Sequence, residues 1–286
     1  MMRSASTLKA LLIVLALTAP AEASPTSSPV LAAHRAVYKL SLAHAEARAG
    51  LNDVQGKLVL EVAGSPCEGW TSNMRVVNQL AARSGKSSIL DTRSTSWEAG
   101  PGDSMEFATQ RFVNGDQELD LKGRAIRDEA GAVITLEMPE EAESELPAGT
   151  IFPVEHTRRI LETAMRGGKR DSSLVYDGNE EQQALFASTF IGNPKPAGSV
   201  KIPAEAKGAA DLTKLKSWPV SIGYFENAPS EEEADGEQMP EHQISFTMFE
   251  NAVATDLTLD YGDFTLKGDL VELTYLPQES CPTSAN

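Results

Sequence analysis

The sequence predicts a mainly β protein, built from one long antiparallel sheet with one main α-helix. Apolar and polar residues alternate in many short segments, which is the period of a strand with one buried face. Turn signals such as Asn114-Gly115 separate these segments. Only residues 154–166 repeat apolar residues convincingly at helical spacing. A sheet of this length must curl or close in order to bury its apolar face.

The first half of the chain is predicted to form an antiparallel meander. Tyr38, Leu40 and Leu42 share one face of the first strand. Asn114-Gly115 accepts the positive φ angles of a type I′ turn, so its flanking strands should form a hairpin. Residues 140–145 are expected to form an acidic loop. The expected strands are 35–44, 54–62, 70–76, 87–92, 94–98, 105–113, 118–126 and 133–138.

The predicted helix follows this meander. Pro153 suits the first turn, where its missing N–H costs nothing. Gly167-Gly168 ends the helix. A lone amphipathic helix among strands is expected to pack on, or plug, one opening of the curved sheet. Strand patterns then return at 172–176, 185–191, 218–224, 244–248, 253–259 and 264–276.

The first 23 residues predict export. A basic start is followed by the apolar run 10–19 and by Ala21-Glu22-Ala23, which supplies small residues for cleavage after Ala23. The run is too short to be a permanent membrane anchor. Residues 1–23 are therefore predicted to be a signal peptide and residues 24–286 a single soluble, periplasmic domain.

The chain has two cysteines, Cys67 and Cys281. In an oxidising compartment they would pair and tie an early turn of the sheet to its last strand. The alternative is a pair of separate buried thiols.

Charge and motifs argue against several functions. A net charge of −16 makes nucleic acid a poor partner. The chain has neither a Gly-x-Ser-x-Gly elbow nor a phosphate-binding glycine loop, and we expect no enzyme and no cofactor. His156 with Glu155 and Glu162 could form an acid–base set, but the better interpretation is a solvated helix face or an N-terminal hydrogen bond.

No metal site is predicted either. His34, His44, His156 and His242 do not have the helical spacing of metal ligands. Within the acidic stretch 228–240, residues 231–236 faintly resemble the start of a calcium loop, but the twelfth position counted from Glu231 is His242 instead of an acid. A solvated loop is the better interpretation.

The concave face of the sheet is the candidate ligand site. Aliphatic and aromatic residues on that face make either a packed core or a lipid-sized cavity, and the pattern alone does not separate the two. Trp70, Trp97 and Trp218 are candidates for the lining, although buried tryptophan usually belongs to a core. No ligand-binding residue is identified.

Several short motifs resemble the EipB family of periplasmic cell-envelope integrity proteins from Gram-negative bacteria. Each is weak alone, and together they run in order through nearly the whole chain after residue 23. They are residues 34–38 (HRAVY), 67–70 (CEGW), 72–75 (SNMR), 146–150 (LPAGT), Phe152-Pro153, His156-Thr157, 243–246 (QISF), 260–264 (DYGDF) and Cys281.

The resemblance implies a β-spiral, a long antiparallel sheet wound into an open barrel-like shape with a helix against it, similar to the LolA and LolB lipoprotein carriers. It also implies a disulfide between Cys67 and Cys281, and it transfers no catalytic residue. We therefore expect a non-enzymatic protein that supports the cell envelope through envelope protein partners or an apolar ligand. The alternative is a carrier of lipid or of lipoprotein acyl chains.

Overall fold

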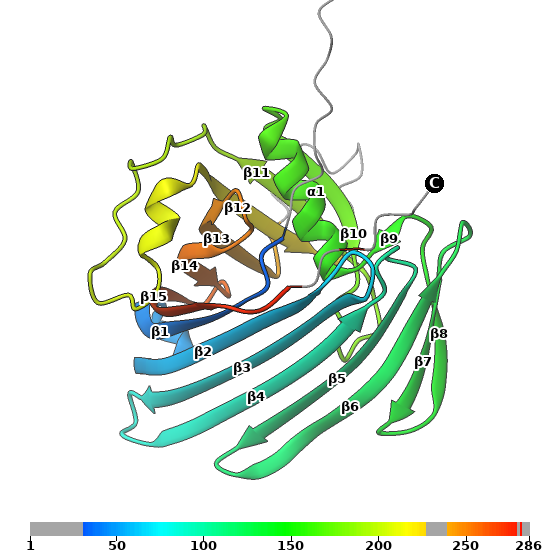
Figure 1. Ribbon diagram of the computed structural model, residues 1–286. Coiled ribbons are helices and arrows are strands. Elements are labelled where there is room, and N and C mark those ends of the chain that lie inside the picture. The colour runs from blue at the N-terminus through cyan, green and yellow to red at the C-terminus, as the bar shows by residue number, and fades with distance from the viewer. Residues whose placement is uncertain (1–30, 227–238, 279–280, 282–286) are drawn as a thin grey trace, which may run out of the picture.

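One 15-stranded sheet organises the chain in the computed structural model, which describes residues 31–226, 239–278 and 281. The predicted signal peptide and residues 228–238 of the acidic stretch lie outside the described residues. The strand order is β8-β7-β6-β5-β4-β3-β2-β1-β15-β14-β13-β12-β11-β10-β9. All neighbours are antiparallel except β9 and β10. The sheet winds into a nearly closed, barrel-like shape (Figure 1), which confirms the predicted fold class.

The strands follow the predicted alternation closely. The first eight are β1 (His34–Ala45), β2 (Leu51–Ser65), β3 (Gly69–Ala82), β4 (Ser87–Glu98), β5 (Ser104–Val113), β6 (Asp116–Arg127), β7 (Ala132–Met138) and β8 (Ala142–Leu146). The others are β9 (Thr150–Ile151), β10 (Arg170–Val175), β11 (Leu185–Ile191), β12 (Ser217–Phe225), β13 (His242–Phe249), β14 (Ala254–Asp260) and β15 (Phe264–Tyr275).

Two predictions about local structure are wrong. The expected strands 87–92 and 94–98 form the single strand β4, because Arg93 continues the ladder opposite Arg75. Residues 140–145, expected as a loop, contain most of the edge strand β8. An edge strand pairs on one side only and accepts charged side chains, so its acidic sequence does not prevent pairing with β7.

The α-helix α1 (Pro153–Met165) confirms the predicted helix and lies beside β10 and β11. Its buried residues include Ile160, Leu161 and Ala164, which pack in one core cluster with Trp70 and Trp218. A second cluster lies under the short 3-10 helix η2 (Ala210–Lys214), against β1, β14 and β15. Figure 1 shows α1 near β10 and the yellow η2 segment on the β14–β15 side.

The edge strands β8 and β9 are consecutive in the chain, with only residues 147–149 between them. We call the place where the β8 end of the sheet meets the β9 end the seam. The β10–β11 loop (residues 176–184) comes from the β9 end and contacts strands of the β8 end. Tyr176 packs edge-to-face on Phe107 of β5, with ring centroids 5.7 Å apart. Ser144 of β8 donates a hydrogen bond to the Gln182 side-chain carbonyl at 3.0 Å. The loop therefore joins the two halves of the wound sheet.

Cys67, in the turn between β2 and β3, is disulfide-bonded to Cys281, 214 residues later, with their Cα atoms 5.7 Å apart. The bond ties the first half of the sheet to the segment that follows its last strand, as the sequence predicts.

Candidate functional site: a cavity inside the wound sheet

The concave face of the sheet encloses a cavity of about 590 Å³. This volume lies within the usual range of small-molecule sites. Strands from both halves of the sheet, the first turns of α1 and the β10–β11 loop all contribute to the lining. The question left open by the sequence, a filled core or a cavity, is thus answered in favour of a cavity.

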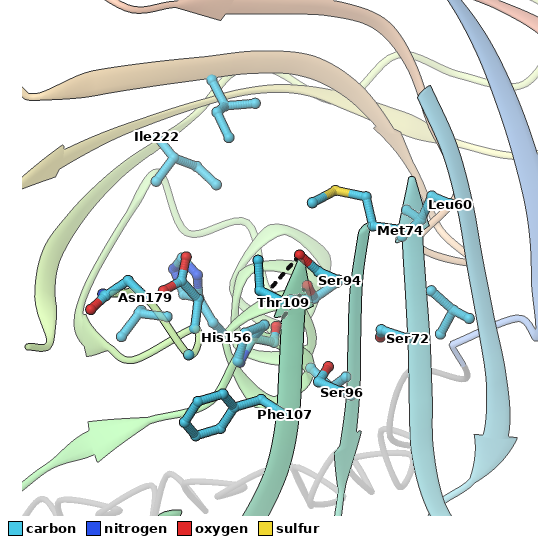
Figure 2. A pocket seen from close by; sticks show the side chains of 18 of the residues that line it. Leu60, Ser72, Met74, Ser94, Ser96, Phe107, Thr109, His156, Asn179 and Ile222 are labelled. Atoms are coloured by element: carbon cyan, nitrogen blue, oxygen red, sulfur yellow. Dashed lines mark hydrogen bonds between the residues drawn. The ribbon is translucent and has the colours of Figure 1, made fainter. Parts of the chain in front are cut away.

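Much of the cavity wall is apolar. Leu60 and Met74 are paired across β2 and β3, and Ile222 and Ile244 are paired across β12 and β13. Figure 2 shows Leu60 and Met74 on one side of the open space and Ile222 on the other. Met74 is 37% exposed and lines the cavity, so part of its side chain is accessible to a ligand and is not packed in a core.

The tryptophans do not form this wall. Trp70 and Trp218 are only 6% and 5% exposed and pack in the core cluster with α1. Trp97 is exposed, and its strand neighbours Ser96 and Glu98 point to the opposite face of β4. Of the two interpretations of the tryptophans, core packing therefore holds for Trp70 and Trp218.

A band of hydroxyl groups crosses three neighbouring strands on the cavity side. Ser72 of β3 is paired with Ser96 of β4, and Ser94 of β4 is paired with Thr109 of β5. The Ser94 and Thr109 hydroxyls are hydrogen-bonded at 3.1 Å (Figure 2). These groups give an otherwise apolar wall a few positions that can orient a polar group of a ligand.

His156 of α1 is buried in this cavity wall, at 4% exposure, so the predicted solvated helix face is wrong at this position. The N-terminal hydrogen bond was the other expectation, and the described residues offer no partner to its Nε2. Burial lowers the pKa of the imidazole to about 4, which keeps it neutral near pH 7. A neutral imidazole is a hydrogen-bonding group that a ligand can satisfy.

The first turn of α1 is held by a carboxylate from β4. Both Glu98 side-chain oxygens accept the backbone N–H of Val154 at 3.0 Å, and Glu98 is 2% exposed. Burial raises the pKa of this carboxyl to about 7, against the hydrogen bonds that favour its ionised form. Beside it, Arg127 of β6 forms an ion pair with Glu155 at 2.8 Å. This cluster fixes the helix that carries His156.

Acidic residues of the β10–β11 loop line another part of the cavity. They are Asp177, Glu180 and Glu181. Arg111 of β5 forms an ion pair with Glu180 at 2.6 Å. Asp177 has a large exposed fraction, yet burial raises the pKa of its carboxyl. Both observations are compatible because Asp177 lines the cavity, so it keeps accessible surface while protein atoms surround it.

Sequence reasoning missed Glu98, His156 and Asp177 as residues of the site. Asp177 carries a turn signal with Gly178, and Glu98 ends a strand, so neither has a local pattern that differs from an ordinary surface acid. Their positions depend on how distant strands meet. No group of three His, Cys, Asp or Glu residues suited to a metal ion occurs within the described residues. Among those residues, no helix has the length and apolar character needed to cross a membrane.

Comparisons with known proteins agree with this architecture. A family model described as EipB-like matches residues 25–277. The cell envelope integrity protein EipB of Brucella abortus (strain 2308) is 32% identical over 252 residues, which cover 88% of this chain and 86% of that protein. A crystal structure from Brucella abortus, described as a beta-barrel-like protein of a domain of unknown function, superimposes with a TM-score of 0.78. It is 28% identical in sequence and covers 87% of this chain and 99% of that one.

Proposed function

Because the chain belongs to the EipB-like family, we propose that it supports the integrity of the cell envelope, the role in the name of its Brucella relative. We further propose that it does so without catalysis, by holding an apolar ligand. The observation that carries the second proposal is the cavity of about 590 Å³ with its largely apolar lining. A cavity of this kind favours ligand binding over a purely structural role.

The proposed location is the periplasm. The predicted signal peptide of residues 1–23 supports export. The disulfide between Cys67 and Cys281 supports an oxidising compartment, because such bonds persist there.

The ligand class that fits the wall is an alkyl or acyl chain. Each methylene group that leaves water for an apolar wall contributes about 0.8 kcal/mol. Leu60, Val62, Met74 and Phe246 supply such a wall from both halves of the sheet. The hydroxyl band of Ser72, Ser94, Ser96 and Thr109 adds hydrogen-bonding positions for an ester or amide group. A lipid or a lipoprotein acyl chain meets both requirements.

A titration with a neutral fluorescent probe, N-phenyl-1-naphthylamine, tests this proposal. Ser96 lines the cavity, so Ser96→Trp places an indole in it, whereas Ser87→Trp places one on the outer face of the same strand. We expect saturable binding to the wild-type protein and to Ser87→Trp, and at least tenfold weaker binding to Ser96→Trp. Equal binding to all three would contradict a site in the cavity.

The envelope role is tested in a strain that lacks this protein. We expect wild type and Ser87→Trp to restore resistance to detergent, and Ser96→Trp to fail although it is folded and exported. Full restoration of detergent resistance by Ser96→Trp would show that envelope integrity does not depend on an open cavity.

A second candidate function is binding to an acidic envelope protein. It is favoured by three exposed arginines close in sequence in α1 and at the start of β10, Arg158, Arg166 and Arg170, on a chain whose net charge is −16. Met165 and Phe190 add apolar surface, at 48% and 52% exposure, and the Arg170 guanidinium lies 5.1 Å from the Phe190 ring centre. Cross-linking in the envelope fraction should map contacts to these residues, and contacts distributed over the whole surface would contradict it.

A further inference from the structure

The charge of the cavity lining is unbalanced. Asp177, Glu180 and Glu181 line it from one loop, and Arg111 is the only arginine or lysine among the lining residues described. Arg111 already forms an ion pair with Glu180, through both of its terminal nitrogens. His242 also lines the cavity, but burial lowers the pKa of its imidazole and so favours the neutral form. Asp177 and Glu181 therefore have no balancing positive charge in the lining.

Burial raises the pKa of one of these two carboxyl groups, that of Asp177. Its own backbone N–H and the side chain of Asn179 donate hydrogen bonds to it. Within the described part of the chain, neither Asp177 nor Glu181 forms an ion pair with a basic side chain. Removing a carboxylate from bulk water without a counter-charge costs free energy. A cation in the cavity would offset that cost.

A second polar group lies in the same wall, independent of the acidic loop. The Nε2 atom of His156 is buried without a partner in the described residues and belongs to the first turn of α1. That turn and the end of β10 lie together, because the Tyr176 backbone N–H donates to the Ile151 carbonyl at 3.0 Å, close in sequence to the lining residues Pro153 and Asp177. Polar groups of α1 and of the β10–β11 loop thus line the same cavity, while Leu60 and Met74 give the β2–β3 wall apolar surface.

We propose that the cavity selects amphiphiles with a positively charged head group, such as a protonated amine or a quaternary ammonium. The head group lies against Asp177 and Glu181, and the alkyl chain lies along Leu60 and Met74. This inference rests on the proposed apolar-ligand function and names its ligand class. Tyr224, also in the lining, offers an aromatic ring near the head group, and aromatic faces attract quaternary ammonium groups.

The test is displacement of N-phenyl-1-naphthylamine by twelve-carbon chains that differ only in their heads, all kept below their micelle concentrations. Dodecyltrimethylammonium, dodecanol and dodecyl sulfate supply the positive, neutral and negative heads. We expect the cationic chain to bind at least tenfold more tightly than dodecanol and the anionic chain to bind most weakly. Asp177→Asn and Glu181→Gln should each reduce the ratio of cationic to neutral affinity severalfold.

The control is Glu129→Gln, which removes one negative charge from an exposed turn outside the cavity. It should leave the ratio of cationic to neutral affinity unchanged. A general attraction between a cation and an acidic protein would instead lower this ratio equally in all three variants. An equal fall in Glu129→Gln, or equal affinities for the three heads, would overturn the inference while the apolar-ligand function stands. If neither the probe nor any chain binds, both proposals fail.

Discussion

A single buried side chain, Glu98, links the sheet to the helix that lines the cavity. It takes the role that a serine or aspartate at the helix start would normally take, since the N-cap residue Phe152 has no side-chain hydrogen bond. The carboxylate comes from β4, 56 residues earlier in the chain. Its protonation state should therefore be measurable in the stability of the whole protein.

The first prediction concerns Glu98→Gln and pH. Burial raises the pKa of Glu98 from its ordinary value of 4.5 to about 7, so its contribution to stability is complete below pH 4.5 and is lost as the pH rises through 7. Glutamine does not titrate. We expect the stability of Glu98→Gln relative to wild type to increase by about 2 kcal/mol between pH 5 and pH 8, measured by urea unfolding.

His156 has the opposite dependence. Its lowered pKa gives a contribution that is present above pH 6.5 and is lost as the pH falls through 4. Both proteins in the comparison keep His156, so its effect cancels in the difference. The exposed variant Glu129→Gln is the control and should show no comparable trend with pH. A difference between Glu98→Gln and wild type that does not change with pH would contradict the assignment.

At the residue scale, the sequence predicted the disulfide but not the polar groups of the cavity. Two cysteines in a chain that is predicted to be exported have one possible partner each, so Cys67 and Cys281 could be paired without knowing the fold. Glu98, His156 and Asp177 acquire their roles from burial, and burial depends on contacts between distant strands. Their local patterns are those of ordinary surface residues.

At the scale of elements, the β10–β11 loop is the part that holds the wound sheet together across its seam. Gly178 in this loop has φ of +82°, a conformation that favours glycine, and a Cβ added there would lie 2.8 Å from the Phe107 ring. Phe107 in turn packs on Tyr176 of the same loop. The absence of a side chain at residue 178 therefore allows the loop to approach β5 closely.

The second prediction is that Gly178→Ala destabilises the protein by about 2–3 kcal/mol, seen as a lower melting temperature in circular dichroism. Gly149→Ala is a matched control, because Gly149 has the same φ of +82° and open space around its Cβ position. The control should cost only the backbone strain, about 1 kcal/mol. Equal melting temperatures for the two variants would show that the contact with Phe107 is not limiting.

Most elements could be predicted from alternation, because a strand with one buried face leaves a period of two in the sequence. The exception is informative. Residues 142–146 have an acidic pattern and still form β8, since an edge strand needs only the backbone of β7 and tolerates charged side chains. The winding of the sheet was expected from its length, but the seam contacts, such as that between Ser144 and Gln182, have no local signal.

At the scale of the whole molecule, the disulfide closes a loop that contains every strand from β3 to β15. Cys67 and Cys281 are 214 residues apart. In the chain-entropy model such a bond stabilises the folded state by about 5 kcal/mol, by restricting the unfolded chain. The bond is thus expected to keep the β2–β3 turn beside the segment that follows β15 when the protein begins to unfold.

The third prediction is that the double variant Cys67→Ser, Cys281→Ser has a melting temperature lower by about 10 °C, measured by calorimetry. Reduced wild-type protein should show a similar shift, which controls for the serine side chains. Two free thiols titrating in the native, unreduced protein would contradict the bond itself.

The central claim is that the wound sheet exists to enclose a ligand. Native mass spectrometry of the protein purified from the envelope, without detergent, tests this most directly. The account predicts one bound amphiphile per chain in the wild-type protein and in Ser87→Trp, and none in Ser96→Trp. Wild-type protein that carries no ligand, and that takes up none when envelope lipids are added back, would contradict it.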